Sequence, residues 1–128
     1  MRLMEFCDGI QHIGIPTNRY EETIAFYEKI GFGTTYQTVN EGNKVGFLKF
    51  ESLELEVYES TDISPRDGAV NHFAVNCNDI DATYDNAVKE GFEILEPGIR
   101  ELPFWANGIR FFIIVGPNKE KIEFCQIL

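Results

Sequence analysis

His12-Ile13-Gly14-Ile15 decides the fold, because the same pattern returns 60 positions later as His72-Phe73-Ala74-Val75. Each copy alternates polar or small residues with apolar ones, which is the two-residue period of a strand with one buried face. His12 and His72 are the only histidines in the 128-residue sequence. We therefore interpret the chain as a duplication with one histidine in each copy.

Further matches extend the duplication beyond these two strands. Nineteen residues after each histidine comes a Gly-Phe pair, Gly31-Phe32 in the first copy and Gly91-Phe92 in the second. Each copy then ends in a strand-like segment that places a glutamate between apolar neighbours, Leu55-Glu56-Val57 and Ile122-Glu123-Phe124. One histidine and one glutamate from each copy indicate a metal site to which both copies contribute.

The length and composition favour an ordinary folded protein. A chain of 128 residues fits one domain, or two fused half-size units, and 44% apolar residues can supply its core. A net charge of −10 repels phosphate backbones and anionic lipids, so we expect neither nucleic-acid nor membrane binding. The acidic excess is typical of a soluble surface, although part of it is available to surround a cation.

Localisation is predicted to be cytoplasmic. No apolar run approaches the roughly 20 residues that span a bilayer, and the first residues lack the apolar region of a signal peptide. The three cysteines, Cys7, Cys77 and Cys125, are an odd number without metal-type spacing. This favours reduced thiols over a disulfide framework.

The periodicity predicts two modules of the same β-α-β-β-β order, joined by a linker over about 60–68. Module one, about 9–60, is predicted to contain a strand over 9–16 that Pro16 stops, a helix over 19–30, and strands over 33–40, 44–50 and 53–59. Module two, about 69–128, is predicted to contain a strand over 69–76, a helix over 79–90, and strands over 92–96, 109–115 and 121–127. An extra segment over 98–107 helps explain why 51 residues separate His72 from Glu123, against 44 between His12 and Glu56.

Strand alternation assigns the four candidate ligands to one kind of surface. On each strand the neighbouring apolar residues are predicted to face the helix, so His12, Glu56, His72 and Glu123 lie on the faces turned away from the helices. Glu54 shares the face of Glu56 and is the competing ligand. Glu56 is preferred because the residues around it align better with those around Glu123.

Two imidazoles and two carboxylates suit divalent Zn, Ni, Co, Mn or Fe. Four protein ligands in a six-coordinate site leave two positions for water or substrate. Such an ion polarises a bound oxygen and stabilises an enediolate, while a neighbouring carboxylate moves a proton. The alternative for each of these side chains is a solvated or hydrogen-bonded residue without a ligand role.

Five motifs carry a resemblance to a known family. They are Ile10-Gln11-His12-Ile13-Gly14-Ile15, Phe26-Tyr27-Glu28-Lys29-Ile30-Gly31-Phe32, Leu55-Glu56-Val57-Tyr58-Glu59, Asn71-His72-Phe73-Ala74-Val75 and Gly116-Pro117-Asn118-Lys119-Glu120-Lys121-Ile122-Glu123-Phe124. Over nearly its whole length the chain resembles the vicinal-oxygen-chelate superfamily, which includes glyoxalase I, methylmalonyl-CoA epimerase, extradiol dioxygenases, and fosfomycin and bleomycin resistance proteins. The resemblance implies an α+β fold, with a single domain over 1–128 made of two tandem βαβββ modules and a curved mixed sheet around a cavity.

Within that superfamily, glyoxalase I has the ligand set that falls here on His12, Glu56, His72 and Glu123. The resemblance implies a divalent-metal-dependent lyase or isomerase, with Zn or Ni as the first expectation and Co, Mn or Fe after them. It would act through a metal-bound enediolate on a small 2-oxoaldehyde–thiol adduct, with Glu123 as the base and Glu56 as its partner. The resemblance also implies a homodimer, and leaves open whether each metal site lies within one chain or across two.

Three alternatives remain beside this function. A methylmalonyl-CoA-type epimerase uses the same proton chemistry. An extradiol dioxygenase holds iron with two histidines and one glutamate, so a fourth ligand at Glu56 and the lack of a third histidine argue against it. A non-enzymatic drug-binding resistance protein lacks the metal ligands that are present here.

Residues near the predicted ligands have both substrate-contact and structural interpretations. Arg100 and Arg110 either meet an anionic substrate or are surface charges. The aromatic residues Phe47, Phe104 and Trp105 either wall an apolar pocket or pack in the core or a dimer interface. Cys125 shares the face of Glu123 and is expected to be a buried, inert thiol.

Overall fold

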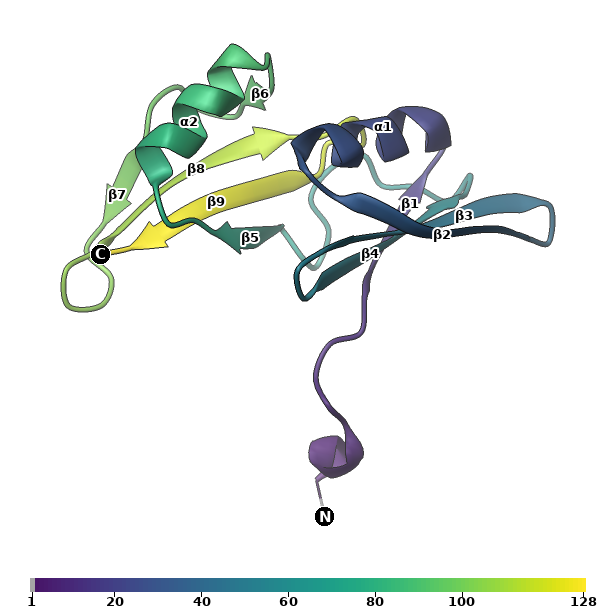
Figure 1. Cartoon of the computed structure of the whole chain (residues 1–128). Coiled ribbons are helices and arrows are strands. Elements are labelled where there is room, and N and C mark those ends of the chain that lie inside the picture. The colour runs from purple at the N-terminus through teal and green to yellow at the C-terminus, as the bar shows by residue number, and fades with distance from the viewer. Residues whose placement is uncertain (1) are drawn as a thin grey trace. The chain divides into compact units, whose positions relative to one another are not determined.

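Each half of the chain folds into a mixed β-sheet with one α-helix packed on it (Figure 1). The structure is a computed structural model that describes residues 2–128, and it divides into two units, one ending at Ile63 and the other running Ser64–Leu128. The α+β class predicted from the sequence is confirmed.

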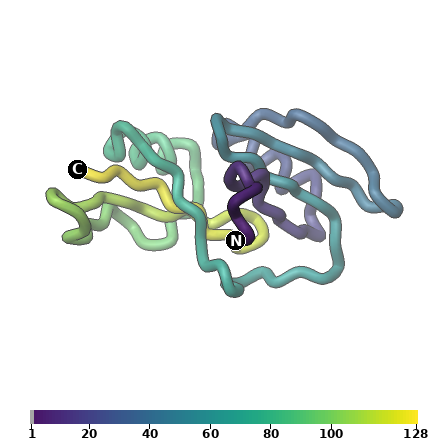
Figure 2. The backbone as a smooth tube through the Cα atoms, turned by 90° about the horizontal axis from the view of Figure 1, so that it is seen from below, coloured from purple at the N-terminus to yellow at the C-terminus, as the bar shows by residue number. Residues whose placement is uncertain are grey.

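The described residues of the first unit form one short 3-10 helix, one α-helix and four strands. They are η1 (Leu3–Phe6), β1 (Ile13–Thr17), α1 (Tyr20–Ile30), β2 (Gly33–Asn40), β3 (Asn43–Phe50) and β4 (Leu53–Glu59). The strand order is β1-β4-β3-β2, with β1 parallel to β4 and the other pairs antiparallel. Glu41 and Gly42, at φ 50° and 82°, close the long β2–β3 hairpin that is visible in Figure 2, because a tight hairpin turn of this kind takes two residues with positive φ.

The second unit repeats this plan with one additional strand. Its elements are β5 (His72–Asn76), α2 (Ile80–Lys89), β6 (Glu93–Ile94), β7 (Arg100–Leu102), β8 (Ile109–Val115) and β9 (Lys121–Ile127). The strand order is β5-β9-β8-β6, with β5 parallel to β9, and β7 also pairs with β8. Neither α1 nor α2, nor any other described helix, has the length and apolar character that a bilayer crossing demands.

The core of each unit lies between its helix and one face of its sheet. On β4, Leu55 and Val57 are fully buried, whereas Glu56 between them lies on the opposite face. On β9, Ile122 is fully buried and Glu123 lies on the opposite face. Strand alternation produces this division, and it leaves each sheet with a face that carries no helix, which we call the open face.

The prediction that Pro16 stops the first strand is wrong. β1 starts at Ile13 and continues to Thr17, and Pro16 is paired in register with Tyr58. β1 is the edge strand of its sheet, where one side of the backbone makes no ladder hydrogen bonds. Proline is tolerated there because its missing N–H breaks no pairing.

The strand predicted over 92–96 is also wrong in extent. It is reduced to the two residues of β6, and β7 forms within the extra segment over 98–107. Both short strands pair with β8, β6 at one end and β7 at the other. Pairing with a long neighbour, rather than local periodicity, therefore defines them.

Gly46 on β3 is expected to be required for packing of α1. A Cβ built at this position would lie 2.5 Å from Tyr20 Oη and 2.9 Å from Ile24 Cδ1. We expect Gly46→Ala to lower the free energy of unfolding by about 1–3 kcal/mol, since overpacking forces side chains from their rotamers. Urea denaturation measures the change, and Gly68→Ala, where an added Cβ meets no atom within 4 Å, is the control. Equal stability of the two variants would contradict the prediction.

Candidate metal centre

The open face of the first unit brings His12 and Glu56 together. His12 precedes β1, and its Nε2 lies 3.5 Å from Oε1 of Glu56 on β4. Gly14, two residues after His12, is the register partner of Glu56. A Cβ at Gly14 would stand 3.9 Å from that same carboxylate oxygen, so the small residue leaves space above the strand for the carboxylate.

The second unit forms the same pair with the same register. Nε2 of His72 lies 3.3 Å from Oε1 of Glu123. Ala74, two residues after His72, is the register partner of Glu123, as Gly14 is of Glu56. The parallel pairing of a first and a last strand thus places one imidazole beside one carboxylate in each unit. His72 is 41% exposed and Glu123 15%, so the pair is accessible from solvent.

A carboxamide side chain holds each histidine ring from the other side. Asn71 Oδ1 lies 2.9 Å from Nδ1 of His72, and Gln11 Oε1 contacts Nδ1 of His12. An amide oxygen only accepts hydrogen bonds, so Nδ1 is the donor in both pairs. In the neutral ring this leaves the lone pair on Nε2, directed at a carboxylate oxygen.

This arrangement fits a divalent cation. The Nε2 lone pair and the carboxylate oxygen are both acceptors, so they repel each other unless a proton or a cation lies between them. Two ligands at about 2.1 Å from one ion, at angles of 90–110°, lie about 3.0–3.4 Å apart. The separation of 3.3 Å in the second unit lies within that range, and the separation of 3.5 Å in the first unit lies just above it. Among the described residues no group of three or more His, Cys, Asp or Glu side chains could hold a metal ion, so each unit by itself presents one His–Glu pair.

Glu54, the competing ligand, has a different partner. Its Oε2 accepts a hydrogen bond of 2.8 Å from Nε2 of Gln11, the residue whose oxygen contacts the His12 ring. The second unit supports the same distinction, because the residue before Glu123 on the same face is Lys121, which pairs in register with His72 and cannot bind a cation. The structure therefore places Glu56, and not Glu54, in the position equivalent to Glu123.

Alanine substitutions separate these two glutamates. We expect Glu56→Ala to abolish stoichiometric binding of a divalent ion, and Glu54→Ala to weaken it only mildly, through a less well oriented Gln11. Isothermal titration with Zn²⁺ measures both affinities. Loss of metal binding in Glu54→Ala, with binding retained in Glu56→Ala, would show that Glu54 is the ligand and Glu56 is not.

The amide residues before the histidines were not assigned a role from the sequence. The signal was present, because Gln11 and Asn71 occupy equivalent positions of the repeat. Outer-shell partners of metal-bound histidines fix the ring orientation, and their loss commonly costs about 10–100-fold in metal affinity. We expect a loss of that size in Gln11→Ala and in Asn71→Ala, measured by competition with a chromogenic chelator. If the metal affinity of these variants equals that of the unmodified protein, Gln11 and Asn71 do not contribute to metal binding.

Aromatic and thiol groups border the two His–Glu pairs. Phe47 on β3 is the register partner of Glu56 and lies edge-on to the His12 ring, with centroids 5.8 Å apart. Tyr36 on β2 lies beside Phe47, which extends the aromatic surface. In the second unit, burial and the nearby Glu123 carboxylate raise the pKa of the Cys125 thiol, so this group is a neutral neighbour rather than a thiolate. Cys7, Cys77 and Cys125 are free.

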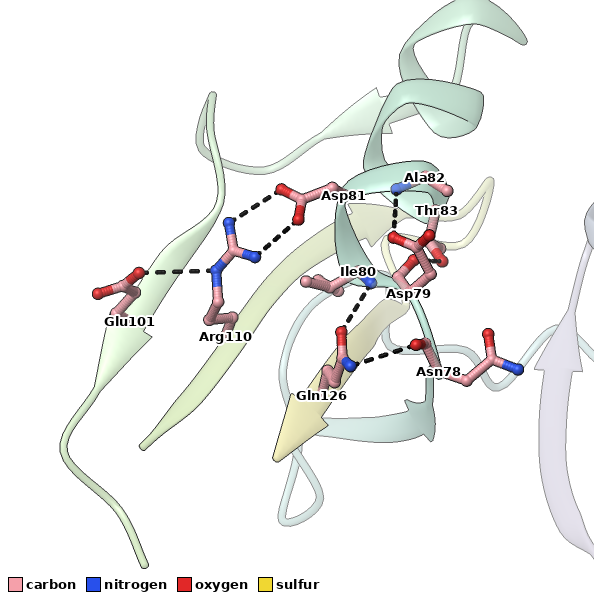
Figure 3. Close-up of polar contacts among 9 residues, drawn as sticks. All are labelled: Asn78, Asp79, Ile80, Asp81, Ala82, Thr83, Glu101, Arg110 and Gln126. Atoms are coloured by element: carbon pink, nitrogen blue, oxygen red, sulfur yellow. Dashed lines mark hydrogen bonds and ion pairs between the residues drawn. The ribbon is translucent and has the colours of Figure 1, made fainter. Parts of the chain in front are cut away.

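The two arginines that the sequence leaves open as substrate contacts or surface charges differ in environment. Arg110 makes a bidentate contact of 2.8 and 2.9 Å with Asp81 on α2 and lies 3.6 Å from Glu101 (Figure 3). Its guanidinium lowers the pKa of the Asp81 carboxyl through these hydrogen bonds. Arg110 therefore ties β8 to the helix, whereas Arg100 forms an ion pair with Glu96.

Phe104 and Trp105 lie apart from the His72–Glu123 pair in the connection between β7 and β8. Their rings contact each other edge-to-face at 6.0 Å and are 51% and 65% exposed. Trp105 lines an open cleft of about 480 Å³ together with neighbouring residues of this connection and Leu128. Neither residue is packed in the core of the second unit.

Comparison with known proteins assigns the family. A sequence model of the Glyoxalase/Bleomycin resistance protein/Dioxygenase superfamily matches residues 9–124. The chain belongs to this superfamily. It is 34% identical over 125 residues to the uncharacterized protein YwbC of Bacillus subtilis (strain 168), covering 91% of this chain and 96% of that protein.

Solved structures of this superfamily confirm the vicinal-oxygen-chelate fold expected from the sequence motifs. The glyoxalase family protein from Enterococcus faecalis matches with a TM-score of 0.79 and 25% identity, over 94% of this chain and 98% of that one. The fosfomycin resistance protein FosX from Listeria monocytogenes, solved with Mn(II) and a sulfate ion, matches with a TM-score of 0.71 and 17% identity, over 94% and 93% of the two chains.

Proposed function

We propose that this superfamily member is a divalent-metal-dependent lyase or isomerase of the glyoxalase I type, and that His12, Glu56, His72 and Glu123 bind one metal ion. The observation that carries the proposal is the pair of equivalent His–Glu contacts, each with an amide oxygen at the far ring nitrogen. The presence of a carboxylate in both pairs favours four protein ligands over the two histidines and one glutamate of the dioxygenases.

The proposed metal ion is Zn or Ni first, with Co, Mn or Fe as the other candidates. When bound, it supplies Lewis-acid polarisation of a substrate carbonyl. The FosX protein that shares this fold was solved with Mn(II), which supports a divalent ion in this fold without choosing among these metals.

Glu123 is proposed to be the base. Its carboxylate is the less exposed of the two, at 15% against 28% for Glu56, and a base with less access to water loses fewer protons to solvent. Glu123 removes the proton from the hemithioacetal carbon beside the carbonyl and returns it to the former carbonyl carbon. The hydroxyl proton of the hemithioacetal moves to the former carbonyl oxygen, so that the product is a thioester with a hydroxyl group on the next carbon. Asn71 keeps the His72 ring in one orientation during these transfers, and the neutral thiol of Cys125 adds no competing charge.

The substrate is proposed to be a small 2-oxoaldehyde–thiol adduct. Phe47 and Tyr36 offer an apolar surface next to the first His–Glu pair, which suits the hydrocarbon part of such an adduct. The protein is further proposed to be a cytoplasmic homodimer that acts on a small molecule and binds neither nucleic acid nor membranes.

Metal analysis combined with an ultraviolet assay tests the function. The protein, reconstituted separately with Zn²⁺ and Ni²⁺, is expected to hold one ion per chain and to form thioester from methylglyoxal adducts of glutathione, cysteine or coenzyme A. Glu54→Gln is the matched control on the same strand face and should retain activity.

Three outcomes would overturn the proposal. A chain that binds no ion after reconstitution would exclude metal-dependent chemistry and favour sequestration. Solvent hydrogen exchange at the acidic carbon of a coenzyme A thioester, without thioester formation from the aldehyde adducts, would indicate an epimerase. Oxygen uptake with a catechol in the presence of Fe(II) would indicate a dioxygenase.

A further inference from the structure

Arg100 lies on the open face of the second sheet, the face that carries His72 and Glu123. The register shows this, because Arg100 on β7 is paired with Phe111 on β8, which is paired with Cys125 on β9. Cross-strand partners share a face, and Cys125 is two residues from Glu123. Arg110, in contrast, faces α2, where Asp81 holds it (Figure 3).

The surface between Arg100 and Glu123 is apolar. Ile113 on β8 is the register partner of Glu123, and Leu95 donates its backbone N–H to the Ile113 carbonyl. A small cavity of about 40 Å³ lies beside Arg100 and β8, and it is lined by Leu95, Glu96, Arg100, Phe111, Phe112 and Ile113. Two strand spacings and two residues along the strand separate the Cα atoms of Arg100 and Glu123, which amounts to roughly 12 Å.

The charge of Arg100 is available to a ligand. Its partner is the side chain of Glu96, and the two side chains are 53% and 59% exposed. Exposed ion pairs contribute little to stability, so an incoming anion displaces Glu96 at small cost. Lys121, the other cation on the open face of the described strands in this unit, is held at 2.7 Å by Asp67.

We propose that Arg100 recognises an anionic group at the far end of the substrate, while the carbonyl end reacts at Glu123. Leu95, Phe111 and Ile113 contact the carbon atoms that join the two ends of the substrate. In the absence of substrate, Glu96 forms the ion pair with the Arg100 guanidinium. The planar guanidinium binds a carboxylate through two parallel hydrogen bonds. This assignment rests on the proposed function and narrows its substrate class to small carbonyl compounds with a carboxylate or similar anion a few carbons away.

Two keto acids of equal chain length test the assignment. 2-Oxoglutarate and 2-oxopentanoate share the carbonyl end, but only the first has a carboxylate at the other end. Binding of each is measured by isothermal titration to the Zn²⁺-loaded protein. We expect 2-oxoglutarate to bind about 10-fold or more tightly than 2-oxopentanoate, on the basis of one bidentate charge-assisted contact.

Variants at Arg100 and Glu96 are expected to act in opposite directions. Arg100→Gln should abolish the preference for 2-oxoglutarate, and Arg100→Lys should keep part of it. Glu96→Gln removes the competing carboxylate and should tighten binding of 2-oxoglutarate several-fold, with 2-oxopentanoate unaffected. Arg110→Gln, an arginine on the helix face, is the control and should leave the preference unchanged.

Equal affinities for the two acids in the unmodified protein would overturn the proposal. A preference that persists in Arg100→Gln would also overturn it, and so would weaker binding in both Arg100→Gln and Glu96→Gln, which marks a purely structural ion pair. The test separates this proposal from the proposed function. An Arg100-dependent preference found in protein that forms no thioester would retain the anion site and reject the lyase.

Discussion

Glu123→Gln is expected to lower kcat by about 10²- to 10⁴-fold, the range attributed to a positioned general base. Glutamine keeps the shape of the side chain and an oxygen that can remain a metal ligand, but it cannot take up a proton at neutral pH. The metal content should therefore fall less than the rate does. Steady-state kinetics with the best methylglyoxal–thiol adduct, together with metal analysis of the same sample, measure the two effects.

Glu56→Gln is the matched comparison for this prediction, because it occupies the equivalent register position in the first unit. It should lower kcat less than Glu123→Gln does. A larger loss of kcat in Glu56→Gln than in Glu123→Gln would show that Glu56, and not Glu123, is the base. A rate in Glu123→Gln close to that of the unmodified protein would exclude this residue as the base.

His12→Ala and His72→Ala are each expected to weaken binding of a divalent ion by more than about 100-fold, because each removes a proposed direct ligand and even outer-shell losses cost about 10–100-fold. The two variants should be similar, although the histidines belong to different units. Removal of either ligand leaves the remaining set incomplete. Competition titration with a chelator of known affinity measures the change for Zn²⁺.

Asn76→Ala is the control for these variants, since Asn76 lies on the open face of the same strand as His72. It should bind Zn²⁺ as the unmodified protein does. A protein in which one histidine variant loses the ion and the other keeps it would show that the two units do not share one site.

Most of the fold was predictable because the spacing of apolar residues along each segment indicates a strand or a helix. The alternation around Leu55 and Val57 identified β4, and both helices start and end within about a residue of the predicted positions. β6 and β7 were not predictable in the same way, because two or three residues carry no readable period and only pairing with β8 defines them. The prediction at Pro16 was wrong because a strand accepts proline at the edge of a sheet, and local sequence does not show which strand is at the edge.

The candidate site was predictable only as far as the repeat could be read. Equivalent positions selected Glu56 over Glu54, and the structure places Glu56 beside His12. The ligand roles themselves remain predictions. The repeat alone did not show that Gln11 contacts both the His12 ring and Glu54, because such a contact depends on side-chain direction across two strands. Arg100 and Arg110 were likewise indistinguishable until the strand register placed them on opposite faces.

The parallel pairing of β1 with β4 and of β5 with β9 makes the spacing of each His–Glu pair independent of the length of chain between its members. The seven additional residues in the second interval leave its contact as short as the first. The connection between β7 and β8 is thus a permissive place for grafting new loops, whereas inserting a single residue inside β4 or β9 would invert every side chain that follows it.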